Sequence, residues 1–118
     1  MCHSKMRCLK INEMWVNFIL SGNKTWEIRH RNTKIRERIA LGNTKSKRVV
    51  GYATIVDSVE MTIEELKKHN DKHQANDFLD NYAKKRKTLF AWFLKDVEVE
   101  AVPKRYSRST GSWCRILK

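Results

Sequence analysis

Residues 88–94, with the sequence TLFAWFL, are the segment that most restricts how this 118-residue chain can fold. The segment is apolar on both faces of a strand, which predicts a central strand buried on both sides. The next residues, 95–102, alternate between polar and apolar types, and this period predicts a strand with one face in water. The rest of the chain must therefore supply layers that cover a sheet.

Helices are predicted in three places. Residues 12–21 carry apolar residues at helical spacing, between Asn12 as the N-cap and Gly22 just after the last turn. Residues 62–73 open with a capping box, and residues 74–87 continue the helical pattern. The side chains of this last segment predicted to face inward are Phe78, Leu79 and Tyr82.

Further strands are predicted over 25–29, 38–42, 48–61 and 112–117. Gly51 interrupts the longest of these and predicts a bulge or a close approach of two backbones. Helices interrupt the strands instead of alternating with them, which indicates an α+β fold: a small curved sheet or barrel with helices at its ends. We expect one domain over residues 1–118, with residues 1–7 loosely ordered.

The charge of the chain favours a polyanionic partner. Twenty-five Lys and Arg residues against 13 Asp and Glu residues give a formal net charge of +12. A field of this kind attracts polyanions and speeds their encounter. The partner predicted from charge is RNA, another single-stranded nucleic acid or a nucleotide. The alternative is a basic protein whose charge serves only solubility.

Membrane, disulfide and metal classes are not favoured by the sequence. No apolar run is long enough to span a bilayer and no signal-peptide pattern is present, which predicts a soluble, cytoplasmic protein. No cofactor is predicted, and an odd number of cysteines does not favour a disulfide framework. Cys2, His3 and Cys8 match the spacing of no common zinc site. His69, His73 and Asp77 recur every four residues on one helical face, with a metal site as one interpretation and solvated surface as the expected one.

A short charged stretch follows the first predicted helix. Along strand 25–29 side chains alternate between faces, so one face carries Thr25, Glu27 and Arg29, and Lys24 lies just before the strand. A carboxylate accepts hydrogen bonds from an amine or hydroxyl, and arginine makes forked contacts to phosphate or a base edge. A partly desolvated lysine can act as a base or nucleophile. The alternative is an exposed face with an ordinary ion pair.

This stretch resembles a known family. Residues 8–31 are similar to the start of an ASCH domain, a family of the PUA-like superfamily, and residues 38–42 and 49–57 resemble its next two strands. Met14 stands where members often carry proline. The family motif G-x-K-x-x-E-x-R and the aromatic position before it are matched by Gly22, Lys24, Glu27, Arg29 and Trp15.

The resemblance implies a small PUA-like β-barrel flanked by helices, with the motif in a cleft suited to RNA or a modified nucleoside. In this view Lys24, Glu27 and Arg29 contact the ligand. The family is thought chiefly to bind RNA, and some small bacterial members resemble enzymes. One type deacetylates a modified cytidine with a lysine, a threonine and a glutamate. Their positions fall here on Lys24, on Glu27 and near His73, so two of the three roles are changed.

The other enzymatic type cleaves RNA, which needs a base and a group that stabilises the phosphorane. Lys24, Arg29 and Ser112 are the residues available for those roles. Three hypotheses therefore remain open: an RNA- or nucleotide-binding domain, an enzyme of the same fold that uses Lys24, and an adaptor that binds proteins. The oligomeric state is left open as well.

Several residues outside the motif have two interpretations. Trp15 either packs under the motif or stacks on a base, whereas Trp92 is predicted to be core. The basic segment 104–112 is either a surface loop or a lid over the cleft, in which Arg105 and Arg108 grip phosphates.

Overall fold

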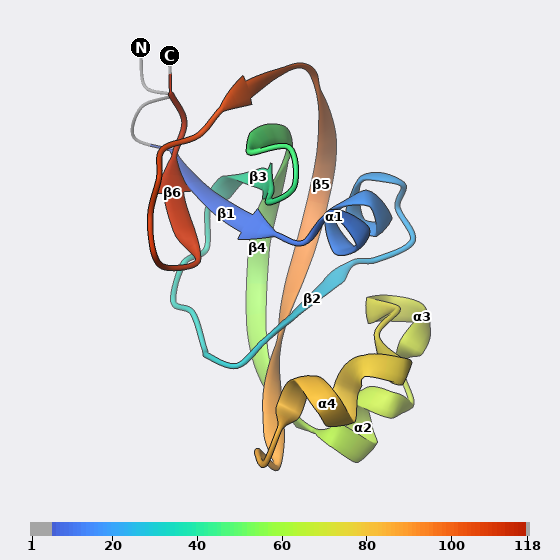
Figure 1. Cartoon of the computed structure of the whole chain (residues 1–118). Coiled ribbons are helices and arrows are strands. Elements are labelled where there is room, and N and C mark those ends of the chain that lie inside the picture. Colours follow the sequence, from blue (N-terminus) through green and yellow to red (C-terminus); the bar gives the residue numbers. More distant parts are fainter. Residues whose placement is uncertain (1–5, 118) are drawn as a thin grey trace.

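The computed structural model describes residues 6–117, whose six strands form one sheet (Figure 1). The strands lie in the order β2–β5–β4–β3–β1–β6. Only the β1–β3 pair is parallel among these neighbours. The strand bounds are β1 Arg7–Ile11, β2 Trp26–Arg29, β3 Arg38–Asn43, β4 Arg48–Thr62, β5 Thr88–Arg105 and β6 Trp113–Arg115.

The mixed α+β class is confirmed, but the predicted barrel is not. β2 and β6 are the two ends of the strand order and do not pair with each other, so the sheet formed by residues 6–117 is open. β1 is a strand that the sequence analysis missed, within a segment partly expected to be loose. Arg7 begins this strand and Leu9 is fully buried, while the expectation for residues 1–5 lies outside the described residues.

The long hairpin of β4 and β5 forms the middle of the sheet. β5 is one strand of 18 residues, where two strands and a loop were predicted, because the start of β4 supplies a partner as far as Arg105. The register shifts three times along this pair, as expected for a strongly curved ribbon. Gly51 lies at one shift, and a Cβ there would come within 2.6 Å of the Glu98 carbonyl oxygen. The predicted bulge and close approach are both confirmed.

Helix α1, Glu13–Leu20, begins as predicted. The Asn12 side chain accepts a hydrogen bond from the Met14 amide, and Gly22 follows the helix with a φ of +87°. A positive φ favours glycine because it lacks a Cβ atom. The helix presents Val16 and Ile19 to the sheet, where both are fully buried.

The second helical region is broken into short pieces where two longer helices were predicted. Thr62 and Glu65 form the expected capping box, but the helix ends at Lys67. The prediction that Phe78 and Tyr82 face inward is wrong, since they are 47% and 37% exposed. Leu79, predicted with them, is fully buried, whereas the rings of Phe78 and Tyr82 border a cavity. The pieces are α2 Ile63–Lys67, α3 Asn70–His73, a 3-10 turn Asn76–Phe78 and α4 Leu79–Ala83.

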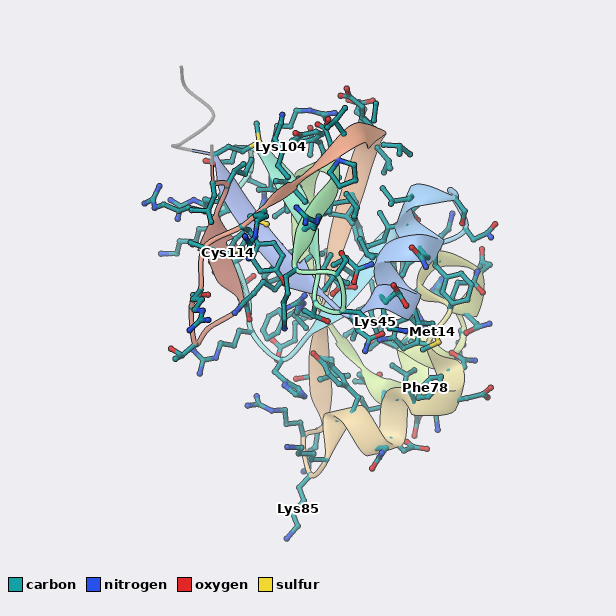
Figure 2. All side chains as sticks on the ribbon, turned by 45° about the horizontal axis from the view of Figure 1, so that its top comes forward. Met14, Lys45, Phe78, Lys85, Lys104 and Cys114 are labelled. Atoms are coloured by element: carbon teal, nitrogen blue, oxygen red, sulfur yellow. The ribbon has the colours of Figure 1, made fainter. Side chains whose placement is uncertain are left out.

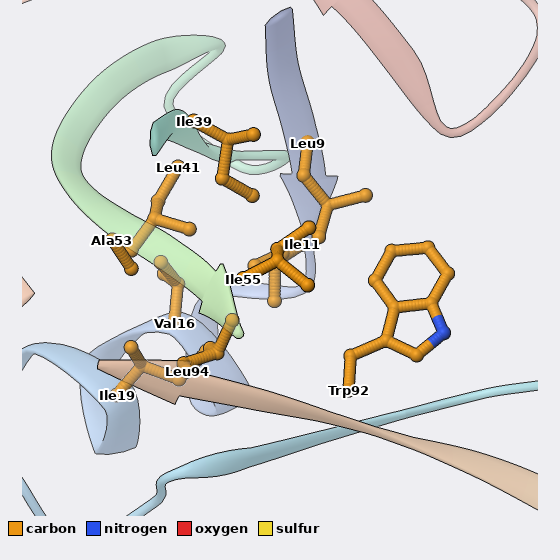
Figure 3. Packing of buried hydrophobic residues seen from close by; sticks show 10 residues of the cluster. All are labelled: Leu9, Ile11, Val16, Ile19, Ile39, Leu41, Ala53, Ile55, Trp92 and Leu94. Carbon is orange, nitrogen blue, oxygen red and sulfur yellow. The ribbon is translucent and has the colours of Figure 1, made fainter. Parts of the chain in front are cut away.

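Figure 3 shows the main apolar core, in which Val16 and Ile19 of α1 pack with side chains of the strands. Trp92 of β5 is 3% exposed and belongs to this core, which confirms its predicted place. A second cluster under α2 and α4 contains Leu66, Leu79 and Leu89. Cys8 and Cys114 are buried free thiols on the paired strands β1 and β6. Among residues 6–117 no helix has the length and apolar character needed to cross a membrane.

Candidate functional site

The chain turn between α1 and β2 places the motif beside the helical region. The Lys24 amide donates to the carbonyl of Phe18, which folds the chain back under α1 after Gly22. The Thr25 amide donates to the carbonyl of Lys72, at 2.8 Å. β2 then pairs with β5, so that Glu27 lies opposite Trp92. The motif is therefore held between α1, α3 and the central strand.

The three charged side chains of the motif form a continuous chain of ion pairs. Glu27 lies between the two cations: its Oε2 accepts from the Arg29 Nε at 2.9 Å, and its Oε1 lies 3.7 Å from the Lys24 Nζ. Lys24 is 1% exposed and Glu27 is 4% exposed. Charged groups are seldom buried to this extent unless they are paired. Two cations share one carboxylate, which leaves an excess positive charge in the site.

Lys24 is the most buried of the three. Its Nζ donates to the carbonyl oxygen of His73 at 2.7 Å and lies 5.0 Å from the centre of the Trp15 ring. Burial lowers the pKa of Lys24 below the ordinary value, the nearby carboxylate of Glu27 opposes this shift, and the charge of Arg29 adds to it. The ammonium thus sits in an apolar and aromatic environment that disfavours its charge.

Arg29 is fixed by three contacts. The first is the ion pair of its Nε with Glu27. In addition, its Nη2 donates to the carbonyl of Lys10 at 2.9 Å, and its Cζ lies 5.7 Å from the centre of the Trp92 ring. Two of the five N–H donors of the guanidinium are used in this way. The remaining donors are therefore available to a ligand that approaches along the side chain, which is 15% exposed.

These residues open onto a cavity of about 390 Å³ between α1, β2 and α4. Its volume is within the range of small-molecule sites, roughly 300–1,000 Å³. Its lining combines charged side chains with the aromatic rings of Trp15, Phe78 and Tyr82. The ring of Phe78 stands edge-on to that of Trp15 at 5.3 Å, and Figure 2 shows Phe78 on the same side of the molecule as Met14 of α1. The cavity lining includes Lys10, Asn12, Trp15, Lys24, Glu27, Arg29, Phe78 and Tyr82.

The structure brings together only some of the predicted site residues. Lys24, Glu27, Arg29 and Trp15 line this cavity. Thr25 is exposed and lies outside the lining, because it precedes the first paired residue of β2.

The C-terminal candidates lie elsewhere. Ser112 lines a second cavity, which shares Arg29 with the first but lacks Lys24. Arg105 and Arg108 are exposed and line neither cavity, since Arg105 still belongs to β5 where it pairs with Arg48.

Sequence reasoning missed the residues that complete the first cavity. Phe78 and Tyr82 were assigned to the core because their spacing suits a helix, yet the broken helix exposes both to the cavity. Lys10 enters from β1, the strand that was not predicted. The only sequence signal for this wall was the aromatic and basic composition of segments that touch the motif through tertiary structure.

His73 contradicts its expected place on a solvated surface, as it is fully buried. Its Nδ1 accepts a hydrogen bond from the Ala75 amide, so the proton resides on Nε2, which donates to the Leu66 carbonyl. Burial lowers the pKa of this imidazole. The neutral ring therefore fixes the turn whose carbonyl holds Lys24. Within residues 6–117 no cluster of three His, Cys, Asp or Glu residues could hold a metal ion; Cys2 and His3 lie outside that range.

Comparison with known proteins gives the family. The ASCH domain model matches residues 9–104, so the chain belongs to the ASCH domain family, as its resemblance predicted. This family is PUA-like and is suggested to bind RNA. No curated protein matches the sequence.

Solved structures share the fold. The crystal structure of ASCH from Zymomonas mobilis superposes with a TM-score of 0.71 and 22% identity, covering 81% of this chain and 71% of that one. A point mutant of the same protein gives a TM-score of 0.74 and 22% identity, with 86% and 76% covered. A second mutant gives 0.74 and 21%, with 87% and 75% covered. At this identity the likeness supports the fold alone.

Proposed function

We propose that this ASCH domain binds RNA or a nucleotide in the cavity lined by Lys24, Glu27 and Arg29. The observation that carries the proposal is the buried ion pair of Lys24 and Glu27 with the partly buried Arg29 beside it, which borders a hollow of about 390 Å³. Burying charge costs free energy, and such a cost is tolerated most readily where the charges serve a ligand. The net charge of +12 gives the same preference for a polyanion.

Each side chain has a distinct role in this proposal. Glu27 accepts a hydrogen bond from an exocyclic amine or hydroxyl of the ligand, and the unused donors of Arg29 contact a phosphate or base edge. Lys24 contributes positive charge beneath them. Trp15, Phe78 and Tyr82 supply aromatic surface against which a base can pack. A single nucleotide unit suits a site of this composition and size better than a duplex does.

Salt dependence distinguishes this proposal from the protein-binding adaptor. If about five phosphates are neutralised on single-stranded RNA, log K falls with log salt concentration at a slope of roughly −3.5. The measurement is fluorescence anisotropy of labelled RNA from low to physiological salt. A slope near zero, or no binding, would contradict RNA binding and favour the adaptor, whose charge serves only solubility.

One observation favours a second candidate, an enzyme of the same fold. The pKa of Lys24 is lowered by burial, and a lysine of that kind can act as a base or a nucleophile. Candidate substrates are RNA for cleavage and N4-acetylcytidine for hydrolysis. Ser112 contributes nothing beside Lys24 in this scheme, because it lines the other cavity.

A turnover assay tests whether this protein is an enzyme. Wild type and Lys24→Met are incubated with labelled RNA and with N4-acetylcytidine, and products are separated by chromatography. Met is preferred to Ala because it fills the buried space that Lys24 occupies. Product from wild type alone supports catalysis by Lys24, whereas no product from either protein leaves binding as the function.

A further inference from the structure

A second cavity of about 470 Å³ adjoins the first. The two share Arg29 and Tyr82, so these side chains stand between them. The rest of the second lining comes from the residues that follow β2, from Trp92, and from Gly111, Ser112 and Trp113 at the start of β6. A ligand that reached past Arg29 from the first cavity would therefore enter the second.

The second cavity differs from the first in its charge. Its described lining contains Arg29 and Arg31 but no acidic side chain, whereas the first contains Glu27. Arg31 is exposed, and its side chain has no ion pair among residues 6–117. A site with cationic groups and no carboxylate favours an anion. Asn32, Thr33 and Ser112 add donors and acceptors of neutral type.

The cavity also has an aromatic wall. The rings of Trp92 and Trp113 are stacked, with centroids 6.0 Å apart and planes inclined by 15°. Trp92 is buried and donates from Nε1 to the carbonyl of Arg31, which fixes the wall, while Trp113 remains partly exposed. Bases stack on aromatic side chains of this kind with little sequence preference. The wall thus combines a surface for a base with cations for a phosphate.

We propose that the second cavity binds the nucleotide adjacent to the one held by the motif, with the linking phosphodiester at Arg29 and the second nucleoside against Trp113 and Arg31. The inference rests on the proposed function, because it takes the first cavity as a nucleotide site. The Nε and Nη2 atoms of Arg29 are engaged by Glu27 and Lys10, and its Nη1 has no hydrogen-bond partner within residues 6–117. The ligand class is therefore single-stranded RNA of at least two nucleotides, whose bases lie apart in two hollows.

The test compares ligands of one and two nucleosides. Isothermal titration calorimetry measures Kd for dinucleoside monophosphates and for 5′- and 3′-mononucleotides of each of the four bases. The dinucleoside monophosphate carries less negative charge than a mononucleotide. If it binds more tightly, the gain therefore comes from contacts of the second nucleoside and not from charge. We expect a gain of about tenfold for the best base, as one stacked base supplies.

Two variants assign that gain to the second cavity. Arg31→Ala should weaken the dinucleoside monophosphate about tenfold and leave mononucleotides within about twofold. Lys85→Ala removes the same charge from an exposed residue at the far tip of the molecule (Figure 2) and should change neither ligand. Thermal melting confirms that both variants are folded.

The binding results distinguish failure of the second nucleotide site from failure of the proposed function. Equal affinities for one and two nucleosides in the wild type, or equal losses for both ligands in Arg31→Ala, would overturn the second nucleotide site and leave the first intact. Absence of binding to every nucleotide and to longer RNA would overturn the proposed function together with the inference.

Discussion

Two arginine clusters of the molecule have nearly the same local geometry. Arg29 pairs with Glu27 at 2.9 Å and lies 5.7 Å from the Trp92 ring. On the central strands, Arg38 pairs with Glu98 at 2.7 Å and lies 6.0 Å from the Tyr52 ring. By pair geometry alone neither cluster would be preferred as a functional site.

Burial and surroundings separate the two clusters. The paired side chains of the motif are 15% and 5% exposed, against 34% and 65% for Arg38 and Glu98. The motif cluster contains a third charge that is almost fully buried, Lys24, and it lines a cavity. An exposed pair contributes little and is screened by salt, whereas a buried one has a large effect when it is broken. Desolvated excess charge beside a hollow therefore distinguishes the candidate site, whereas an ion pair by itself does not.

The largest expected difference concerns the two carboxylates. Glu27→Gln leaves two buried cations without a counter-charge and should lower the free energy of unfolding by about 3 kcal/mol. Glu98→Gln, the matched control on the exposed pair, should lower it by less than about 1 kcal/mol. Urea denaturation followed by circular dichroism measures both. Equal losses in the two variants would remove the distinction between the clusters.

The second-largest expected effect is the pH dependence that Lys24 gives to the free energy of unfolding. Because the pKa of Lys24 is lower in the folded protein, the unfolded chain holds this proton at a pH where the folded protein has released it. Stability from this group therefore rises with pH between the lowered value and the ordinary 10.5, by at most about 1.4 kcal/mol per pH unit. Urea denaturation across this alkaline range should show the rise in wild type and not in Lys24→Met.

The control for that measurement is Lys85→Met, which removes an exposed lysine. It should keep the alkaline rise seen in wild type. A rise of the same size in Lys24→Met as in wild type would show that Lys24 is not the desolvated group.

The smallest expected effect is the pH dependence of stability that Tyr52 contributes in the exposed cluster. Burial, a hydrogen bond of 2.6 Å to Glu100 and the charges nearby raise the pKa of Tyr52 to about 12. Between the ordinary value of 10 and that value the folded protein keeps a proton that the unfolded chain releases, so stability from Tyr52 falls as pH rises. This sign is opposite to that of Lys24.

Ultraviolet titration of tyrosinate checks the assignment. Tyr52→Phe should remove a component that titrates near pH 12, and Glu100→Gln should move it downward only in part, since burial also raises this pKa. An unchanged titration curve in Tyr52→Phe would contradict the raised pKa.

The sequence predicted the charged motif well because its geometry is local. Alternation along β2, the N-cap at Asn12 and the glycine after α1 depend on neighbours in the chain, and each was recovered. The proximity of Lys24 to Glu27 follows from the same short segment. The local pattern did not predict the hydrogen bond that the Lys24 side chain donates to the carbonyl of His73, which lies 49 residues further along the chain.

The wrong predictions concern residues whose positions depend on tertiary contacts more than on their spacing along the chain. Helical periodicity placed Phe78 and Tyr82 in the core, but their face borders the cavity, which leaves both more than a third exposed while Leu79 is fully buried. Of the two interpretations of residues 104–112, a surface loop or a lid, the lid does not bring Arg105 to either cavity, because β4 pairs with β5 that far. The open sheet has a similar cause, since closure depends on curvature and on which edges meet.

The central claim is that the motif cluster, and not its exposed counterpart, binds RNA. Arg29→Met and Arg38→Met remove the same charge, each from a paired arginine beside an aromatic ring. The most direct measurement is the Kd of each variant for single-stranded RNA at one fixed salt concentration, with folding checked by circular dichroism. We expect Arg29→Met to weaken binding by at least about tenfold and Arg38→Met by no more than about twofold. Equal weakening by the two substitutions would contradict the account.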